Sequence, residues 1–312
     1  MKVYLCSTPY HLYISLCNLI TEKNDGYIIL STPDENIFKL FKQYKNNLDK
    51  LDIIKGVFIR KRDNFKERIF LEQIKDILEY KHLKKYIEQN TIYIFPWSPY
   101  GLYTPSEYLF KKSKNVILVE DGSSMYLKKK PSKLSGFVKK YLYFRDLNFY
   151  KKDKISKILV QYPQKYQMHL QTKLTKLDLN YYYGNMENSD KETLINIFNS
   201  NVNIDIFDKA SIILTQPLSE DGFISESQKI ELYEEIVNKM DSNNNIIIKK
   251  HPREITQYNF QNVIEIDGSF PSEIFTLLDI EFEKAIGICT SAVNSIKAKE
   301  AYNIDEKFFE KK

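Results

Sequence analysis

Short apolar runs alternate with amphipathic segments along the first part of the chain. The apolar runs are rich in Val, Ile, Leu and Tyr, which is typical of buried β-strands, and we expect strands at 3–6, 27–30, 53–59, 92–95 and 116–119. The segments between them predict helices at 10–22, 35–45, 66–89 and 105–112. Such alternation is typical of βαβ units, whose parallel sheet is covered by helices on both faces.

A basic and aromatic stretch at 128–157 interrupts this alternation, and a second alternation follows it. There we expect strands at 158–160, 212–215, 245–248, 263–266 and 285–289, and helices at 225–240, 271–279 and 292–300. The sequence therefore predicts an α/β protein with two doubly wound, Rossmann-like domains, at 1–127 and 158–312, joined by a connection at 128–157. Ligands of such sheets bind at the carboxyl ends of the strands, so we expect the domains to face a central cleft.

Composition excludes several classes of protein. Hydrophobic residues make up 43% and charged residues 28% of the 312 residues, which is enough for a large folded core. The sequence has no uncharged apolar stretch of about 18 residues and no signal-peptide pattern at its start, so we expect a cytoplasmic protein. Cys6, Cys17 and Cys289 lie far apart in apolar surroundings and are predicted to be buried thiols.

The net charge of +5 and the lysine runs at 128–130 and 139–140 raise the question of an anionic partner. No nucleic-acid-binding motif accompanies these runs, so we expect no nucleic-acid partner. Two interpretations stay open: an ordinary solvated surface, and peripheral attachment to the anionic cytoplasmic face of an inner membrane.

Common nucleotide and metal motifs are missing from the sequence. It contains neither a GxGxxG fingerprint nor a GxxxxGK[ST] loop, which disfavours a dinucleotide site or a P-loop. The histidines form no metal-spaced pair with one another or with the cysteines, and no Asp-x-Asp motif occurs. We therefore expect no bound metal.

Polar groups follow several predicted strands, at the edge where ligands bind. Ser7-Thr8-Pro9-Tyr10-His11 comes directly after the first strand, and small hydroxyls at a helix start bind an anion or a sugar hydroxyl. The alternative is an ordinary N-cap with proline in the first turn. Glu120-Asp121-Gly122 follows strand 116–119, and its carboxylates suit a general base or an acceptor site, although Asp-Gly is also an ordinary turn.

Two loops of the second part each follow a predicted strand and should lie together. The first contains Gln216 and Asp221, whose carboxylate is suited to deprotonate an attacking hydroxyl. The second is Lys250-His251-Pro252-Arg253, in which the basic neighbours suit the histidine to a phosphate leaving group. The alternatives are a simple lead-in to the next helix and a structural histidine.

Two further junctions lie near the end of the chain. Thr290-Ser291 follows strand 285–289 and opens a predicted helix, so its hydroxyls and the helix amides suit a phosphate, with a plain N-cap as the alternative. Ser269, Pro271 and Glu273 open another predicted helix. The Glu273 carboxylate suits ribose hydroxyls or simply favours the helix N-terminus.

Taken in order, these segments resemble the bacterial sialyltransferases of glycosyltransferase family 52, which make lipooligosaccharide and capsule sialosides. The resemblance covers nearly the whole chain and implies a GT-B architecture. It also implies inverting transfer of sialic acid from CMP-sialic acid to a terminal galactose of a bacterial surface glycan, with no metal or other cofactor.

The resemblance assigns roles to particular residues as well. In related enzymes the histidine of the His-Pro motif and a late serine contact the CMP phosphate, which corresponds to His251 and Ser291. The general base lies either in the loop before the His-Pro motif or in the acidic-acidic-Gly motif. This favours Asp221, with Asp121 second and Glu220 still open.

Other functions remain open at this point. A GT-B transferase with another nucleotide-sugar donor fits the same pattern, because the fold accepts many donors. So does a non-catalytic nucleotide- or glycan-binding partner in polysaccharide assembly. The expected partners are a nucleotide-sugar donor and a glycan acceptor, and the resemblance leaves a homodimer open. Neither the linkage nor the natural acceptor follows from the sequence.

Overall fold

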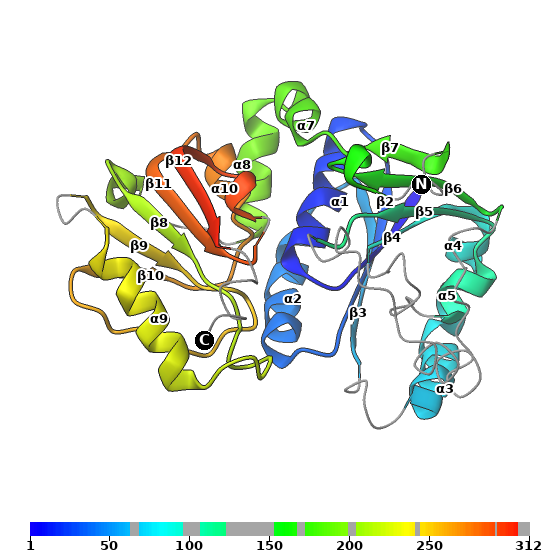
Figure 1. Cartoon of the computed structure of the whole chain (residues 1–312). Coiled ribbons are helices and arrows are strands. Elements are labelled where there is room, and N and C mark those ends of the chain that lie inside the picture. Colours follow the sequence, from blue (N-terminus) through cyan, green and yellow to red (C-terminus); the bar gives the residue numbers. More distant parts are fainter. Residues whose placement is uncertain are drawn as a thin grey trace. The chain divides into compact units, whose positions relative to one another are not determined.

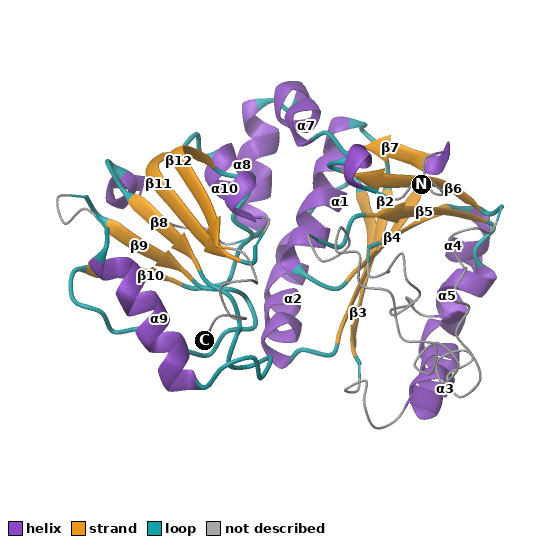
Figure 2. Cartoon of the chain, in the orientation of Figure 1, coloured by secondary structure: helices purple, strands orange, loops and turns teal. Residues whose placement is uncertain are grey.

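The computed structural model describes residues 1–62, 69–95, 107–122, 153–166, 172–198, 204–240, 244–290 and 292–304. The chain divides into two compact units, Met1–Asp190 and Lys191–Lys312, each built on its own sheet (Figure 1). All the described strand pairs are parallel, and helices accompany both sheets (Figure 2). The predicted α/β class is therefore confirmed.

The first unit has a seven-stranded sheet in the order β3-β2-β1-β4-β5-β6-β7. Its strands are β1 (Lys2–Cys6), β2 (Gly26–Thr32), β3 (Ile54–Lys61), β4 (Thr91–Ile94), β5 (Asn115–Val119), β6 (Ile155–Val160) and β7 (Leu174–Lys176). Its helices are α1 (Pro9–Thr21), α2 (Glu35–Leu48), α3 (Ile69–Tyr80), the 3-10 turn η1 (Lys81–Leu83), α4 (Lys84–Gln89), α5 (Glu107–Lys112) and α7 (Leu179–Asn185). The predicted strands between 3 and 119 are all present, and the helix predicted at 66–89 is α3, η1 and α4 in succession, with 66–68 outside the described residues.

Helices cover both faces of this sheet, because successive side chains of a strand point to opposite sides. Val3 and Leu5 of β1 belong to a core that also holds Leu109 of α5. The alternate residue Cys6 points to the other face, where its thiol meets the Ser15 hydroxyl of α1 at 3.3 Å. Figure 1 shows α1 and α2 on one side of the sheet and α3, α4 and α5 on the other.

The second unit has a five-stranded sheet in the order β10-β9-β8-β11-β12. Its strands are β8 (Ser211–Leu214), β9 (Ile246–Lys249), β10 (Val263–Ile266), β11 (Glu281–Ile288) and β12 (Lys297–Ile304). Its helices are α9 (Glu226–Asn238), α10 (Ile274–Leu277) and the 3-10 turn η7 (Ala292–Asn294), while α8 (Asn188–Ile197) spans the boundary between the units. Helix α9 covers β8 and β9, since Tyr233 and Ile236 share a core with Ile213 and Ile248.

The boundary between the two parts differs from the prediction. The run 158–160, expected to open the second domain, lies in β6, which pairs in parallel with β5 of the first sheet. Ile158 and Val160 are buried in the core of the first unit, which extends to Asp190. An apolar run identifies a strand but not the sheet that it joins, so the division expected before 158 is corrected. Of the predicted connection at 128–157, only 153–157 lies among the described residues.

The segment expected to form a helix at 292–300 is instead η7 followed by β12, which pairs in parallel with β11. Lys, Ala and Glu favour helices, but pairing with a long neighbouring strand overrides that preference. Cross-strand ion pairs Lys284–Glu300 at 3.4 Å and Lys299–Glu283 at 2.7 Å support the pairing. The helix predicted at 271–279 is reduced to the single turn of α10.

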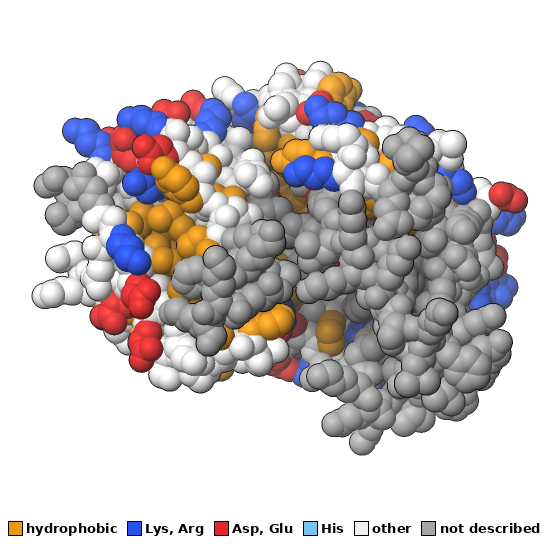
Figure 3. Space-filling model, viewed as in Figure 1, with side chains coloured by type: hydrophobic (Ala, Val, Ile, Leu, Met, Phe, Trp, Pro, Cys, Tyr) orange, Lys and Arg blue, Asp and Glu red, His pale blue; other side chains and the backbone are white. Residues whose placement is uncertain are grey.

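Charged side chains of both signs alternate over the described part of the face in Figure 3. The lysine runs at 128–130 and 139–140 lie outside the described residues. None of the helices in the described ranges is long and apolar enough to cross a membrane. Cys6 and Cys17 are buried free thiols as predicted, whereas the free thiol of Cys289 is only partly buried.

Candidate functional site

The first group of candidate residues lies in the loop between β1 and α1, at the carboxyl edge of the first sheet. Thr8 is the N-cap of α1, and its hydroxyl accepts a hydrogen bond from the backbone N–H of His11 at 3.2 Å. Pro9 occupies the first turn, where a missing N–H costs no helical hydrogen bond. Both residues therefore have the structural role that the sequence left open.

His11 closes the polar motif that follows β1, but no role of its own was predicted for it, and it is fully buried beside this loop. Its ring stacks on Phe95, with the ring centroids 4.7 Å apart. The backbone N–H of Ser7 donates to Nδ1 of His11 at 3.1 Å, and the Ser7 hydroxyl lies 3.2 Å from the same nitrogen. Because Nδ1 accepts a hydrogen bond, the ring proton is on Nε2, which donates to Oδ1 of Asp121 at 2.8 Å. This histidine joins the loops after β1 and β5.

The two carboxylates after β5 have different surroundings. Glu120 is buried, and its carboxylate accepts hydrogen bonds from the backbone N–H of Gln161 at 2.7 Å and from Nε2 of the same residue at 3.4 Å. Asp121 keeps 30% of its side chain exposed. Gly122 follows with φ 146°, a conformation that favours glycine. Glu120 therefore anchors the loop, and Asp121 presents a carboxylate that a ligand can reach.

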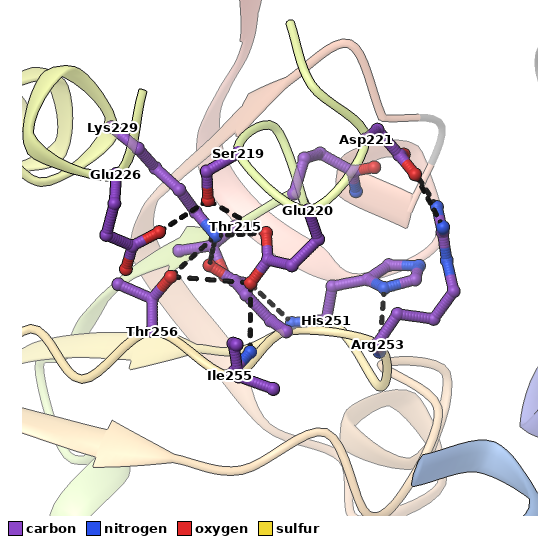
Figure 4. A network of polar contacts seen from close by, with 12 residues as sticks. Thr215, Ser219, Glu220, Asp221, Glu226, Lys229, His251, Arg253, Ile255 and Thr256 are labelled. Atoms are coloured by element: carbon purple, nitrogen blue, oxygen red, sulfur yellow. Dashed lines mark hydrogen bonds and ion pairs between the residues drawn. The ribbon is translucent and has the colours of Figure 1, made fainter. Parts of the chain in front are cut away.

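In the second unit, Asp221 and Arg253 form a bidentate ion pair between the loops that follow β8 and β9 (Figure 4). The guanidinium nitrogens donate to the two carboxylate oxygens at 2.7 and 2.8 Å. Gly222, with φ 75°, turns the chain directly after Asp221. Gln216 is held through its backbone, because its N–H donates to the Tyr233 hydroxyl at 2.9 Å. The two loops meet as predicted, since β8 and β9 are neighbours.

His251 also has a defined tautomer. The backbone N–H of Arg253 donates to Nδ1 of His251 at 3.2 Å, so the ring proton is on Nε2. Burial, reinforced by the positive charge of Arg253, lowers the pKa of His251 to about 3. At neutral pH this side chain is therefore an uncharged hydrogen-bond donor through Nε2.

The basic neighbours of His251 do not surround its ring as expected. Lys249 is buried, and its Nζ donates to the carbonyl oxygens of Asp267 at 2.7 Å and of Phe270 at 2.9 Å. Burial lowers the pKa of this lysine to about 7. Lys250 forms an ion pair with Glu265 at 3.2 Å. The reason is geometric: successive residues at the end of β9 point to opposite faces of the sheet.

Gly268 lies against the His-Pro segment and was missed by sequence reasoning. A Cβ atom on this residue would come within 2.4 Å of Cα and 2.5 Å of N of Pro252. Such distances are too short for any side chain, so only glycine allows the loop after β10 to approach so closely. A glycine two residues after the predicted strand 263–266 was the available signal.

The expected phosphate site at the end of β11 lacks its helix. Thr290 is nearly buried, and the Asn303 side chain binds its backbone N–H at 3.3 Å and its carbonyl at 2.7 Å. The Thr290 hydroxyl accepts a hydrogen bond from the backbone N–H of Ala292 at 3.2 Å. Ser291 lies outside the described residues. Because η7 is a single turn followed by β12, the helix dipole expected to support a phosphate here is absent, and that part of the prediction is wrong.

The remaining candidates, Ser269, Pro271 and Glu273, lie in the segment between β10 and α10. The Ser269 N–H donates to Oδ1 of Asp267 at 2.9 Å, and Pro271 is buried. Glu273 is 3% exposed, and burial raises its pKa to about 7. A carboxyl group so buried binds ribose only if this segment moves.

The structure thus brings together two separate sets of predicted residues, one in each unit. Ser7 and Asp121 meet through His11, and Asp221, Arg253 and His251 meet at the loops after β8 and β9. Within the described ranges no three or more His, Cys, Asp or Glu side chains are grouped so as to hold a metal ion.

Solved structures share this two-sheet fold. The chain aligns with the GT-B domain of a sialyltransferase from Photobacterium damselae, with a TM-score of 0.56, 13% identity, and coverage of 95% of this chain and 89% of that one. It aligns with a Vibrionaceae Photobacterium 2,6-sialyltransferase, solved with the donor product CMP and the acceptor substrate lactose, with a TM-score of 0.60, 13% identity, and coverage of 97% and 71%. A UDP-GlcNAc 2-epimerase from Neisseria meningitidis, bound to UDP-GlcNAc, aligns with a TM-score of 0.53, 10% identity, and coverage of 95% and 80%.

The fold is therefore GT-B, as in the domain of the Photobacterium damselae enzyme. The sequence profile of the alpha-2,8-polysialyltransferase family matches residues 2–305, and the chain belongs to this family. An uncharacterized protein of Haemophilus influenzae is 43% identical over 86 residues, which is 27% of this chain and 28% of that protein. The expected resemblance to bacterial sialyltransferases is confirmed.

Replacing Gly268 by alanine tests the close contact with Pro252. We expect Gly268→Ala to lower the free energy of unfolding by about 1–3 kcal/mol, because backbone atoms have to move apart. Gly184→Ala is the matched control, since a Cβ there meets nothing within 4 Å. Urea unfolding followed by circular dichroism measures both variants. Equal free energies of unfolding for the two variants would contradict the close contact between Gly268 and Pro252.

The depressed pKa of His251 predicts a pH-dependent stability. The folded-state pKa of about 3 lies below the reference value of 6.5, so the unfolded chain binds more protons between these values. The contribution of this histidine is fully present above pH 6.5 and is lost as the pH falls toward 3, by at most about 1.4 kcal/mol per pH unit. His251→Asn should show a shallower loss in urea unfolding between pH 7.5 and 4.5. Parallel curves for the two proteins would contradict the lowered pKa of His251.

Proposed function

We propose that this protein transfers sialic acid from CMP-sialic acid to a terminal galactose of a bacterial surface glycan, a lipooligosaccharide or a capsule, with inversion and without a metal or other cofactor. The family match over residues 2–305 carries the proposal. The binding of CMP and lactose by the Photobacterium enzyme of the same fold supports the choice of donor and acceptor.

In this mechanism the acceptor hydroxyl loses its proton to a carboxylate while its oxygen attacks the anomeric carbon of the donor. The bond from that carbon to the phosphate oxygen breaks, and negative charge develops on the departing CMP. His251 Nε2–H donates a hydrogen bond to a phosphate oxygen, which stabilises that charge without a metal ion. The neutral imidazole acts here as a dipole of fixed direction rather than as a cation.

We assign the general base to Asp121 rather than to Asp221. Both oxygens of Asp221 hold the Arg253 guanidinium, so Asp221 has to give up this ion pair before it can take a proton. Asp121 is partly exposed and receives a hydrogen bond from the neutral His11, which orients the carboxylate without a competing cation. Asp221 is then the residue that holds Arg253 until the donor binds.

Glu220 is a poor candidate for the base. Burial on its own would raise its pKa, but hydrogen bonds from Lys229 and from the Ile255 backbone N–H outweigh this effect and lower the pKa to about 2. The other predicted substrate contacts remain part of the proposal: Ser7, Thr8, Pro9, Glu120, Gly122, Gln216, Lys250, Pro252, Arg253, Ser269, Pro271, Glu273, Thr290 and Ser291.

A different nucleotide-sugar donor is the second candidate, because UDP-GlcNAc 2-epimerases have the same fold. The first experiment distinguishes the two. Purified protein is incubated with CMP-sialic acid and lactose in the presence of EDTA, and CMP release, product mass and anomeric configuration are measured. We expect a sialylated lactose of inverted configuration at an unchanged rate in EDTA. Folded protein that releases no CMP but turns over another nucleotide sugar would refute the donor assignment.

The assignment of the general base predicts that kcat falls more in Asp121→Asn than in Asp221→Asn. Asp121→Asn should lower kcat by about a hundredfold or more, because the near-isosteric amide keeps the hydrogen bond from His11 but accepts no proton. Asp221→Asn should lower kcat by less than about tenfold, since it loses only a partly exposed ion pair. Calorimetric titration with CMP should give a similar Kd for Asp121→Asn and the wild type. The reverse order of the two kcat values would return the role to Asp221.

A further inference from the structure

A buried lysine lies at the centre of a polar network behind the His-Pro segment (Figure 4). Lys229 of α9 is fully buried, and its Nζ lies 2.8 Å from each of three oxygens: Oε2 of Glu220, Oε1 of Glu254 and Oγ1 of Thr256. An ammonium group has three N–H donors, so this lysine is fully satisfied. The oxygens belong to the loop after β8 and to the segment after β9, which α9 thereby holds together.

Glu254 is the member of this network that reaches the candidate site. Its side chain is fully buried, and Oε2 accepts hydrogen bonds from the backbone N–H of His251 at 3.0 Å and from the Thr215 hydroxyl. Oε1 accepts from Lys229 and from the Tyr258 hydroxyl. One carboxylate thus ties the end of β8 to the first residue of the His-Pro segment.

Glu220 secures the other end of the same segment. Its Oε1 accepts a hydrogen bond from the Ile255 backbone N–H at 2.9 Å and lies 3.5 Å from the Thr256 hydroxyl. The segment from His251 to Thr256 is therefore held at both ends by carboxylates that share Lys229. Burying the charges of Lys229 and Glu254 is costly even when they are paired, so the network gains little stability over an apolar core. Its distinctive consequence is a fixed backbone at His251 and Arg253.

We propose that Glu254 is a positioning residue for His251: by holding the His251 backbone N–H, it fixes the turn in which the Arg253 N–H meets Nδ1 and leaves the imidazole proton on Nε2. Figure 4 shows the ring on the Asp221–Arg253 side of the network, away from Lys229. The use of that Nε2–H toward a phosphate rests on the proposed function. The tautomer itself does not.

The first experiment reads the tautomer directly. The chain has only 4 histidines, so NMR of protein labelled with ¹⁵N in the imidazole rings gives a simple spectrum, and His251→Asn identifies the His251 signals. At pH 7.5 the wild type should show a pure Nε2-protonated form for His251. Glu254→Gln puts an amide where the carboxylate accepts four hydrogen bonds, and both ring nitrogens should move toward exchange-averaged shifts.

Two further variants separate positioning from general stability. Ile236→Val removes one methylene from the core under α9 without touching the network, and its His251 signals should match those of the wild type. Thr215→Val removes a single hydrogen bond from Glu254 while keeping every charge, so it should move the His251 shifts in the same direction by a smaller amount. If Glu254→Gln does not fold, Thr215→Val tests the positioning role of Glu254 in its place.

The kinetic readout uses the wild type and the same variants with CMP-sialic acid and lactose. Glu254→Gln should lower kcat by about tenfold or more and leave the KM for lactose nearly unchanged, because only the hydrogen bond to the leaving group loses its direction. A pure Nε2-protonated His251 in folded Glu254→Gln, or in Thr215→Val if the former does not fold, overturns the positioning role. Altered His251 shifts in a protein whose wild type does not use CMP-sialic acid would uphold the positioning role and refute the proposed function instead.

Discussion

A backbone N–H that donates to Nδ1 governs the chemistry of both site histidines. Ser7 supplies this hydrogen bond to His11 in the first unit, and Arg253 supplies it to His251 in the second. In each case the imidazole is uncharged and its single proton is on Nε2. The same backbone hydrogen bond has a different consequence in each unit. The Nε2–H of His11 meets a carboxylate, whereas the Nε2–H of His251 belongs to a segment suited to a leaving phosphate. Neither histidine needs to change charge for the proposed reaction.

The contacts between the site loops depend on the order of the strands in each sheet. His11 reaches Asp121 because β1 and β5 are separated only by β4, and parallel strands end at the same edge. The Asp221–Arg253 pair forms because β8 and β9 are neighbours. Packing of the helices and strands into the two cores fixes where each loop begins. Short hydrogen bonds within the loops then set the orientation of each imidazole ring. The hydrophobic cores therefore determine which loops meet, and the polar contacts determine how the side chains in those loops are oriented.

The apolar runs predicted nearly every strand from the sequence, because a parallel strand buried on both faces reads as a continuous hydrophobic run. They did not predict which sheet β6 joins, since Ile158 and Val160 suit either core. They also missed β12, because its Lys, Ala and Glu residues favour a helix when read locally. Hydrogen-bonding roles were harder to predict: His11 meets Asp121, which lies 110 residues later in the sequence, so no local pattern indicates their contact.

The charges near His251 limit how a phosphate can be bound there. Arg253 is matched by Asp221, Lys250 by Glu265, and the single charge of Lys229 by two glutamates, while Lys249 is engaged by backbone carbonyls. The sequence suggested a cationic pocket and a helix dipole, but these cations are already engaged and the helix is absent. In the proposed reaction, the departing phosphate therefore meets oriented neutral donors first. Arg253 becomes available to it only when Asp221 releases the guanidinium. In the proposed reaction, this arrangement stabilises the charge that develops on the departing CMP more than the charge already present on the donor. A fixed dipole requires no reorganisation, whereas the Asp221–Arg253 ion pair has to be broken before Arg253 can contribute. In the proposed reaction, the Asp221–Arg253 ion pair also sets a cost on binding the free nucleotide, and this cost assists the release of CMP after transfer.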